Sequence, residues 1–112
     1  MQQLNKVTLV GYVGNVRINE LTETRAARFT VMTSITYKGQ DGVVIESTWH
    51  NCTAFESNKL SLAGLEKGAA VKVEGRIRNS RYTDVNGNER TIIEIVVKEL
   101  EILDVKTLET EE

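Results

Sequence analysis

The stretch AVKVEGRIRNSR, residues 70–81, decides the fold class because its apolar and charged residues alternate. From Val71 to Ile77 the odd positions are apolar or glycine, and from Lys72 to Arg78 the even positions are charged. Successive side chains of a strand point to opposite faces of a sheet. The pattern therefore predicts a β-strand with one buried side.

Segments on either side of this strand predict further strands. Downstream, residues 84–88 contain an Asn-Gly turn, and residues 90–98 (RTIIEIVVK) predict a strand that residues 99–104 can extend. Upstream, the glycine-rich turn at residues 39–42 leads into a strand that runs to residue 55. The middle and the end of the chain are thus expected to be largely β-structure.

The connection before residue 70 predicts the only helix, at residues 57–65 (SNKLSLAGL). Ser57 can cap its first turn, and Gly68 can end it. Three leucines between residues 60 and 65 are expected to bury one side of the helix.

Two more strands are predicted in the first third of the chain, at residues 5–13 and 28–37. Gly14 and Asn15 permit a bend or a bulge after the first of them. Residues 16–27 are polar and mixed, so we expect an irregular segment or a short edge strand there.

The predicted order of three strands, one helix and two strands is that of the OB-fold, an all-β, five-stranded Greek-key barrel with a short helix between its third and fourth strands. A chain of 112 residues with 40% hydrophobic content is long enough for one core. We therefore expect one OB-fold domain over residues 1–104, followed by a short acidic tail at residues 105–112.

Composition limits the environment and the partners. No apolar run approaches the roughly 20 residues that span a bilayer, and the N-terminus lacks the pattern of a signal peptide, which predicts a cytoplasmic protein with no membrane partner. The net charge of −2 is unevenly distributed, because residues 1–98 carry +3 and residues 99–112 carry −5. A mildly basic body leaves a nucleic-acid partner open, although an acidic end is often only a solvated terminus.

The stretch TWHNCTAF, residues 48–55, contains the only Trp, the only His and the only Cys of the chain. In a strand, Trp49 and Phe55 share one face with Asn51, whereas His50 and Cys52 point the other way. A half-buried strand normally gathers its large apolar groups on the core side. Rings interleaved with polar residues indicate instead a surface that stacks on a ligand.

Four aromatic rings and several cations therefore form the candidate nucleic-acid site. Each ring taken singly is more simply explained as a half-buried group covering the barrel. Together they suit a binder of single strands, because stacking on a base contributes ~1–3 kcal/mol and tolerates any base. Neighbouring cations would bind phosphates, although a charged strand face is ordinarily just solvated. The candidate residues are Tyr37, Trp49, Phe55 and Tyr82 for stacking, and Arg28, Lys72, Arg76 and Arg78 for phosphates.

Catalysis, metal binding and a cofactor are not predicted. His50 and Cys52 provide half of a metal site, and the chain has no other His or Cys to complete it. As a nucleophile and base they would lack a third group to orient the base. We expect both residues to serve packing or a subunit interface.

A series of motifs runs in order through residues 5–98: Asn5-Lys6-Val7, Leu9 to Gly14, Thr48-Trp49-His50, Phe55, Lys67-Gly68, Val71 to Ile77, Tyr82, Gly87, Arg90 and Glu94 to Val97. In these motifs the sequence resembles the bacterial single-stranded DNA-binding protein (SSB) family. The resemblance implies an OB-fold, a homotetramer joined through its first strand, and sequence-independent binding and protection of single-stranded DNA in replication, recombination and repair. The family's stacking aromatics fall on the four rings named above, with Tyr37 and Tyr82 where other members often carry Trp.

The chain departs from the family pattern at its end. Family members typically continue through a long linker to an acidic tip closed by Pro-Phe, which recruits replication and repair proteins, whereas this sequence stops at residues 108–112 (LETEE). The motif that recruits such partners is therefore missing here, unless the short acidic end replaces it or the sequence is truncated. The alternatives are the primosomal replication protein PriB, another short OB-fold binder, and an OB module that docks a protein on the same rings.

Overall fold

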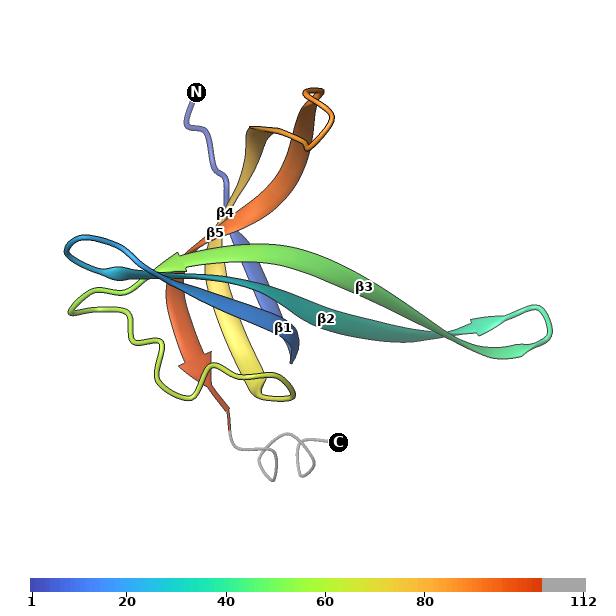
Figure 1. The fold of residues 1–112 in the computed structure, drawn as a ribbon. Helices are drawn as coiled ribbons and strands as arrows, with labels where there is room; N and C mark the ends of the chain where they lie inside the picture. Colours follow the sequence, from blue (N-terminus) through green and yellow to red (C-terminus); the bar gives the residue numbers. More distant parts are fainter. Residues whose placement is uncertain (104–112) are drawn as a thin grey trace.

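A computed structural model describes residues 1–103, and it contains five long strands that close into a barrel in the order β1-β2-β3-β5-β4 (Figure 1). Neighbouring strands are antiparallel except β3 and β5, which pair in parallel at Cys52–Ile95 and Thr53–Val96 and so close the barrel. This is the predicted all-β OB-fold. The predicted acidic tail at residues 105–112 lies outside the described residues. The strands are β1 (Val7–Glu20), β2 (Arg25–Gly39), β3 (Gly42–Phe55), β4 (Ala70–Thr83) and β5 (Glu89–Ile102).

The core consists of alternate residues from all five strands, together with Leu60, Leu62 and Leu65 of the connection between β3 and β4. Val31, Val71 and Val73 are completely buried, and Phe29 packs with them. Full burial of each such side chain stabilises the fold by about 1.5–3 kcal/mol. The alternation of residues 70–77 therefore predicted correctly which side of β4 faces the core up to Gly75.

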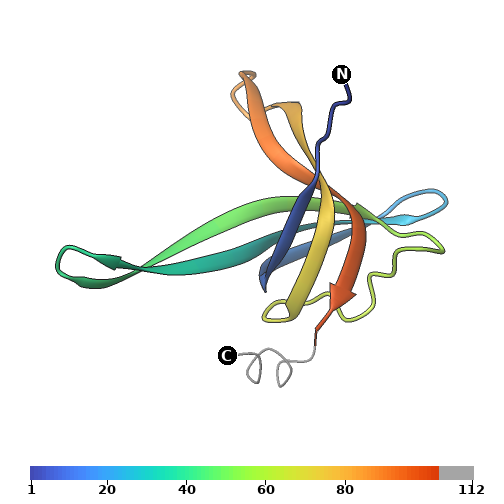
Figure 2. The ribbon, with the colours of Figure 1, turned by 180° about the vertical axis from the view of Figure 1, so that it is seen from behind.

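Two hairpins project from the barrel in different directions, β2–β3 and β4–β5 (Figures 1 and 2). The ladder between β2 and β3 continues to Gly39 and Gly42, but no residue of β2 after Val31 is buried. Gly42 has a φ of 125°, which lets the chain reverse there. Because the outer part of this hairpin packs on nothing else in the described chain, both of its faces are accessible.

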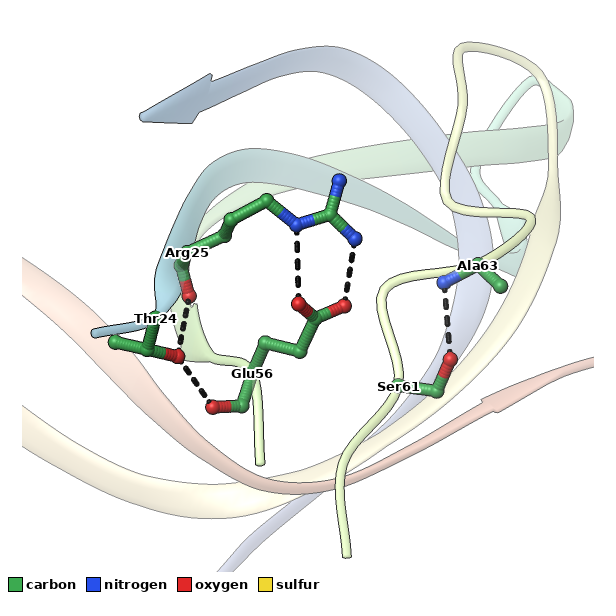
Figure 3. A network of polar contacts seen from close by, with 5 residues as sticks. All are labelled: Thr24, Arg25, Glu56, Ser61 and Ala63. Atoms are coloured by element: carbon green, nitrogen blue, oxygen red, sulfur yellow. Dashed lines mark hydrogen bonds and ion pairs between the residues drawn. The ribbon is translucent and has the colours of Figure 1, made fainter. Parts of the chain in front are cut away.

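The helix predicted at residues 57–65 is wrong. This connection is a series of turns: Ser57 and Leu60 form an isolated bridge, and the Ser61 hydroxyl accepts a hydrogen bond of 3.1 Å from the backbone N–H of Ala63 (Figure 3). Leu60 and Leu62 are both buried, although residues two apart lie on widely separated sides of a helix. Gly64, with a φ of 82°, also departs from helical geometry.

Polar contacts anchor the start of this connection to β2 (Figure 3). Arg25 donates from Nε and Nη2 to the two carboxylate oxygens of Glu56 at 3.0 and 2.7 Å. The Thr24 hydroxyl donates to the Glu56 carbonyl at 2.6 Å. The hydrogen bond from Arg25 lowers the pKa of Glu56, so this fork is retained at neutral pH.

Residues 16–27 are more regular than predicted. β1 continues through a bulge at Gly14-Asn15 and then pairs with the start of β2, with Arg17 opposite Arg28. The bulge expected from Gly14 is confirmed, and the Thr30 hydroxyl accepts the Asn15 N–H at 3.0 Å. Between residues 1 and 103 there is no helix that is long and apolar enough to cross a membrane.

Candidate nucleic-acid interface

β3 presents its rings outward, as its alternation predicts. Trp49 is 57% exposed and Phe55 46% exposed, whereas Cys52 and Ala54 are buried in the core. Thr53 shares the outward side but is buried, because Glu94 of the neighbouring strand β5 covers it with a hydrogen bond of 2.7 Å. Half-exposed rings leave one surface free for a ligand.

The indole of Trp49 is supported by a glycine on β1. Trp49 lies opposite Met32 of β2, and its ring reaches across to Gly14, where an added Cβ would collide with it. The ring thus spans three strands, with its inner side on the sheet and more than half of its surface in solvent. Such support reduces the freedom that a stacking platform would lose on binding.

Arginines from three strands lie beside the rings on the same outward side. Strand pairing places Arg17, Arg28 and Thr53 side by side on β1, β2 and β3. The row continues through Val96 of β5 to Arg76 of β4. We call this surface the aromatic face; its residues are Trp49, Asn51, Thr53 and Phe55 with Arg17, Arg28, Arg76, Arg78 and Glu94.

Arg78 is held by an acidic residue on the aromatic face. Its Nε and Nη2 donate to one carboxylate oxygen of Glu94 at 3.1 and 2.5 Å, and Thr53 donates to the other oxygen. Burial disfavours the charge on Glu94, but the hydrogen bonds from Thr53 and Arg78 outweigh this cost and lower its pKa. Arg78 is therefore paired, whereas none of the ion pairs within residues 1–103 involves Arg28 or Arg76.

The two tyrosines lie on the projecting hairpins. Tyr37 is on the same side of β2 as Phe29 and Val31, which is the side opposite to the neighbours of Trp49. Tyr37 is nevertheless 47% exposed, because this part of the hairpin lies beyond the core. Tyr82 is 52% exposed on β4 opposite Arg90. Tyr37 is therefore on the other side of its sheet from Trp49, whereas Tyr82 is on the same side of β4 as Arg76 and Arg78, farther along the hairpin.

Lys72 has different surroundings from the other predicted cations. It lies opposite Val10 of β1 and Glu101 of β5, and it lines a shallow hollow with Glu74, Glu99 and Glu101. We call this group the acidic end.

Arg17 belongs to the aromatic face but was not among the predicted residues. The sequence signal that could have indicated it was the bulge at Gly14, which shifts the alternation of β1 by one residue.

His50 and Cys52 have local partners. The Nε2 atom of His50 is hydrogen-bonded to the Thr33 hydroxyl at 2.9 Å. Burial, with a smaller contribution from Glu94, raises the pKa of the Cys52 thiol to about 12, which keeps it protonated at neutral pH. Within residues 1–103 no three His, Cys, Asp or Glu side chains gather in a group that could hold a metal ion.

An OB-fold barrel whose sheet carries half-exposed rings beside arginines is the architecture of modules that bind single strands of nucleic acid. Residues 4–103 match the family model described as "Single-strand binding protein family". The chain belongs to this family.

Relatives and solved structures agree with this assignment. The chain is 39% identical to the single-stranded DNA-binding protein of Neisseria meningitidis serogroup A over 106 residues, which are 89% of this chain and 60% of that protein. It is 34% identical to single-stranded DNA-binding protein 1 of Xylella fastidiosa, with 95% of this chain and 82% of that protein covered. The chain thus spans about three fifths of the Neisseria relative.

A solved structure, "Plasmodium falciparum SSB complex with ssDNA", superimposes with a TM-score of 0.78 at 25% sequence identity. The match covers 93% of this chain and 98% of that one. Nearly the whole of the Plasmodium chain thus shares the fold of this chain.

Proposed function

We propose that this chain binds single-stranded DNA without regard to sequence, with bases stacked on Trp49 and Phe55 and phosphates held by Arg28 and Arg76. The observation that carries the proposal is the indole of Trp49, which lies over Gly14, is 57% exposed, and shares its face with two arginines that make no ion pair within residues 1–103. A ring in this position offers ~1–3 kcal/mol of stacking to any base, and the arginines add attraction for the backbone. The relatives carry the same activity in their names.

The hairpins extend the proposed path of the strand. Tyr37 and Tyr82 would stack bases that leave the aromatic face in two directions, and Arg17 would add a phosphate contact beside Arg28. Lys72 is outside this path, because three acidic residues share its hollow and would repel phosphates.

We infer a protective role for the bound protein in replication, recombination and repair, without a catalytic step of its own. Coating exposed strands requires no nucleophile or general base. The buried Cys52 thiol, with its pKa raised to about 12, and His50, bonded to Thr33, are consistent with packing roles.

A homotetramer is part of the proposal. Val10 and Tyr12 point outward from β1 and are 48% and 42% exposed, which provides apolar surface for another copy. Light scattering after gel filtration should give four times the chain mass of 12.5 kDa. A monomer mass at micromolar concentration would contradict the tetramer but leave DNA binding unaffected.

The binding proposal is tested with a fluorescently labelled thymidine oligomer. Its anisotropy should rise on addition of the protein at low salt, the affinity should fall steadily as salt increases, and the corresponding duplex should bind far more weakly. Equal binding of the duplex, or no binding of the oligomer at low salt, would refute the proposal. Rings that dock a protein instead would give the second result.

A further inference from the structure

Glu94 is an unusual residue for a surface that is meant to attract phosphates. It is only 8% exposed, and it lies on the outward side of β5 between Thr53 of β3 and Arg78 of β4. Arg28 of β2 is close enough for its charge to favour the ionised form of Glu94. One carboxylate therefore lies near Arg28, which the proposed function assigns to the DNA backbone, and is paired with Arg78 of the same aromatic face.

The contacts of Glu94 resemble those that a phosphate would make. Two donors of Arg78 point at one oxygen, at 3.1 and 2.5 Å, and the Thr53 hydroxyl points at the other at 2.7 Å. Guanidinium groups bind carboxylates and phosphates in the same charge-assisted manner. A phosphate that took both donors would leave a nearly buried carboxylate without its partner, which costs free energy.

We propose that Glu94 is an internal competitor of the DNA backbone for Arg78, which lowers the affinity of the aromatic face and the salt dependence of binding. This inference rests on the proposed function and adds its regulation. In the free protein the Arg78–Glu94 pair is electrically neutral, so Arg78 adds little to the attraction of a single strand. Arg28 and Arg76 supply that attraction.

Replacing Glu94 tests the competition. Glu94→Gln keeps the size of the side chain and an oxygen that can accept from Thr53, but it releases Arg78. The plot of log affinity against log salt for a thymidine oligomer should become steeper by about 0.7, the contribution of one phosphate on a single strand. If the two proteins converge near 1 M salt, the gain at about 50 mM salt is about eightfold.

Two controls isolate the pair from the total charge. Glu74→Gln changes the net charge equally, but Glu74 pairs with Lys6 at 2.7 Å at the acidic end, so its slope should stay that of the wild type. The double variant Arg78→Gln/Glu94→Gln removes both charges of the neutral pair, and its slope should return to the wild-type value. Thermal unfolding checks that each variant is folded, and Glu94→Met, which is also uncharged and of similar size, replaces Glu94→Gln if that variant does not fold.

The outcomes separate this inference from the proposed function. If the wild type binds and Glu94→Gln has an unchanged slope or binds more weakly, Glu94 does not compete and the inference is overturned, while DNA binding stands. An equal gain in Glu74→Gln would also overturn it, because total charge would then explain the effect. If the wild type binds no single strand, both proposals fail.

Discussion

The aromatic face and the acidic end are two regions on the outside of the barrel, and both contain cations that strand alternation directs outward. On the aromatic face Arg28 and Arg76 lie beside the rings of Trp49 and Phe55, whereas at the acidic end Lys72 lies among Glu74, Glu99 and Glu101. The difference comes from strand pairing, which decides the neighbours of each outward residue. Alternation alone predicts on which side of the sheet a residue lies, but it does not predict which side chains are its neighbours there.

The largest expected effect is that of Trp49→Ala, which removes the central ring of the aromatic face. Affinity for a thymidine oligomer should fall by ~1–3 kcal/mol, because one stacked base loses its platform. Anisotropy titration measures the loss, and thermal unfolding shows whether the fold survives. Wild-type affinity in a folded variant would mean that the aromatic face does not differ from the acidic end in DNA binding.

Gly14→Ala should produce a smaller loss on the same face. The new methyl group would collide with the Trp49 indole and displace the ring without removing it, so affinity should fall by less than in Trp49→Ala and the Trp49 emission should change. Gly11→Ala is the matched control. Its methyl group would collide with the backbone carbonyl of Met32, so it should mainly lower the melting temperature.

Acid should remove the stability that the aromatic face derives from the carboxylate of Glu94. The pKa of Glu94 is below its ordinary value of 4.5, so its contribution to stability is complete above pH 4.5 and is lost as pH falls through the lowered native value. The wild type should therefore melt above Glu94→Gln at pH 7, and the gap should close below pH 4.5. A gap that is constant with pH would contradict the ion pair with Arg78.

The smallest effect is expected from Lys72→Gln at the acidic end. Its positive charge is offset by neighbouring carboxylates, so affinity for the oligomer at low salt should change by less than about twofold. Arg28→Gln is the comparison on the aromatic face. Arg28 makes no ion pair in the described part of the chain, so its loss should flatten the slope of log affinity against log salt by about 0.7. Equal losses in the two variants would mean that DNA also crosses the acidic end.

The sequence predicted the strands and the outward rings because both depend on a period of two residues. The prediction of a helix at residues 57–65 was wrong. The leucine-rich composition indicated a helix, but Leu60, Leu62 and Leu65 are all buried, and they are too closely spaced to share one face of a helix. For residues 16–27 the sequence left an irregular segment and a short edge strand as alternatives, because a polar strand shows no clear alternation. The strand pairing there is made by the backbones of β1 and β2. The surroundings of Lys72 and the place of Arg17 depend on register and on a bulge, which no single strand reveals.

The most direct test of DNA binding on the aromatic face is the fluorescence of Trp49, the only Trp in the chain. Adding a thymidine oligomer at low salt should quench its emission, and raising the salt should restore it as the complex dissociates. Gly14 supports the ring at this position, so the signal reports on the aromatic face itself. Unchanged Trp49 emission while anisotropy shows the oligomer bound would place the DNA elsewhere and contradict the account.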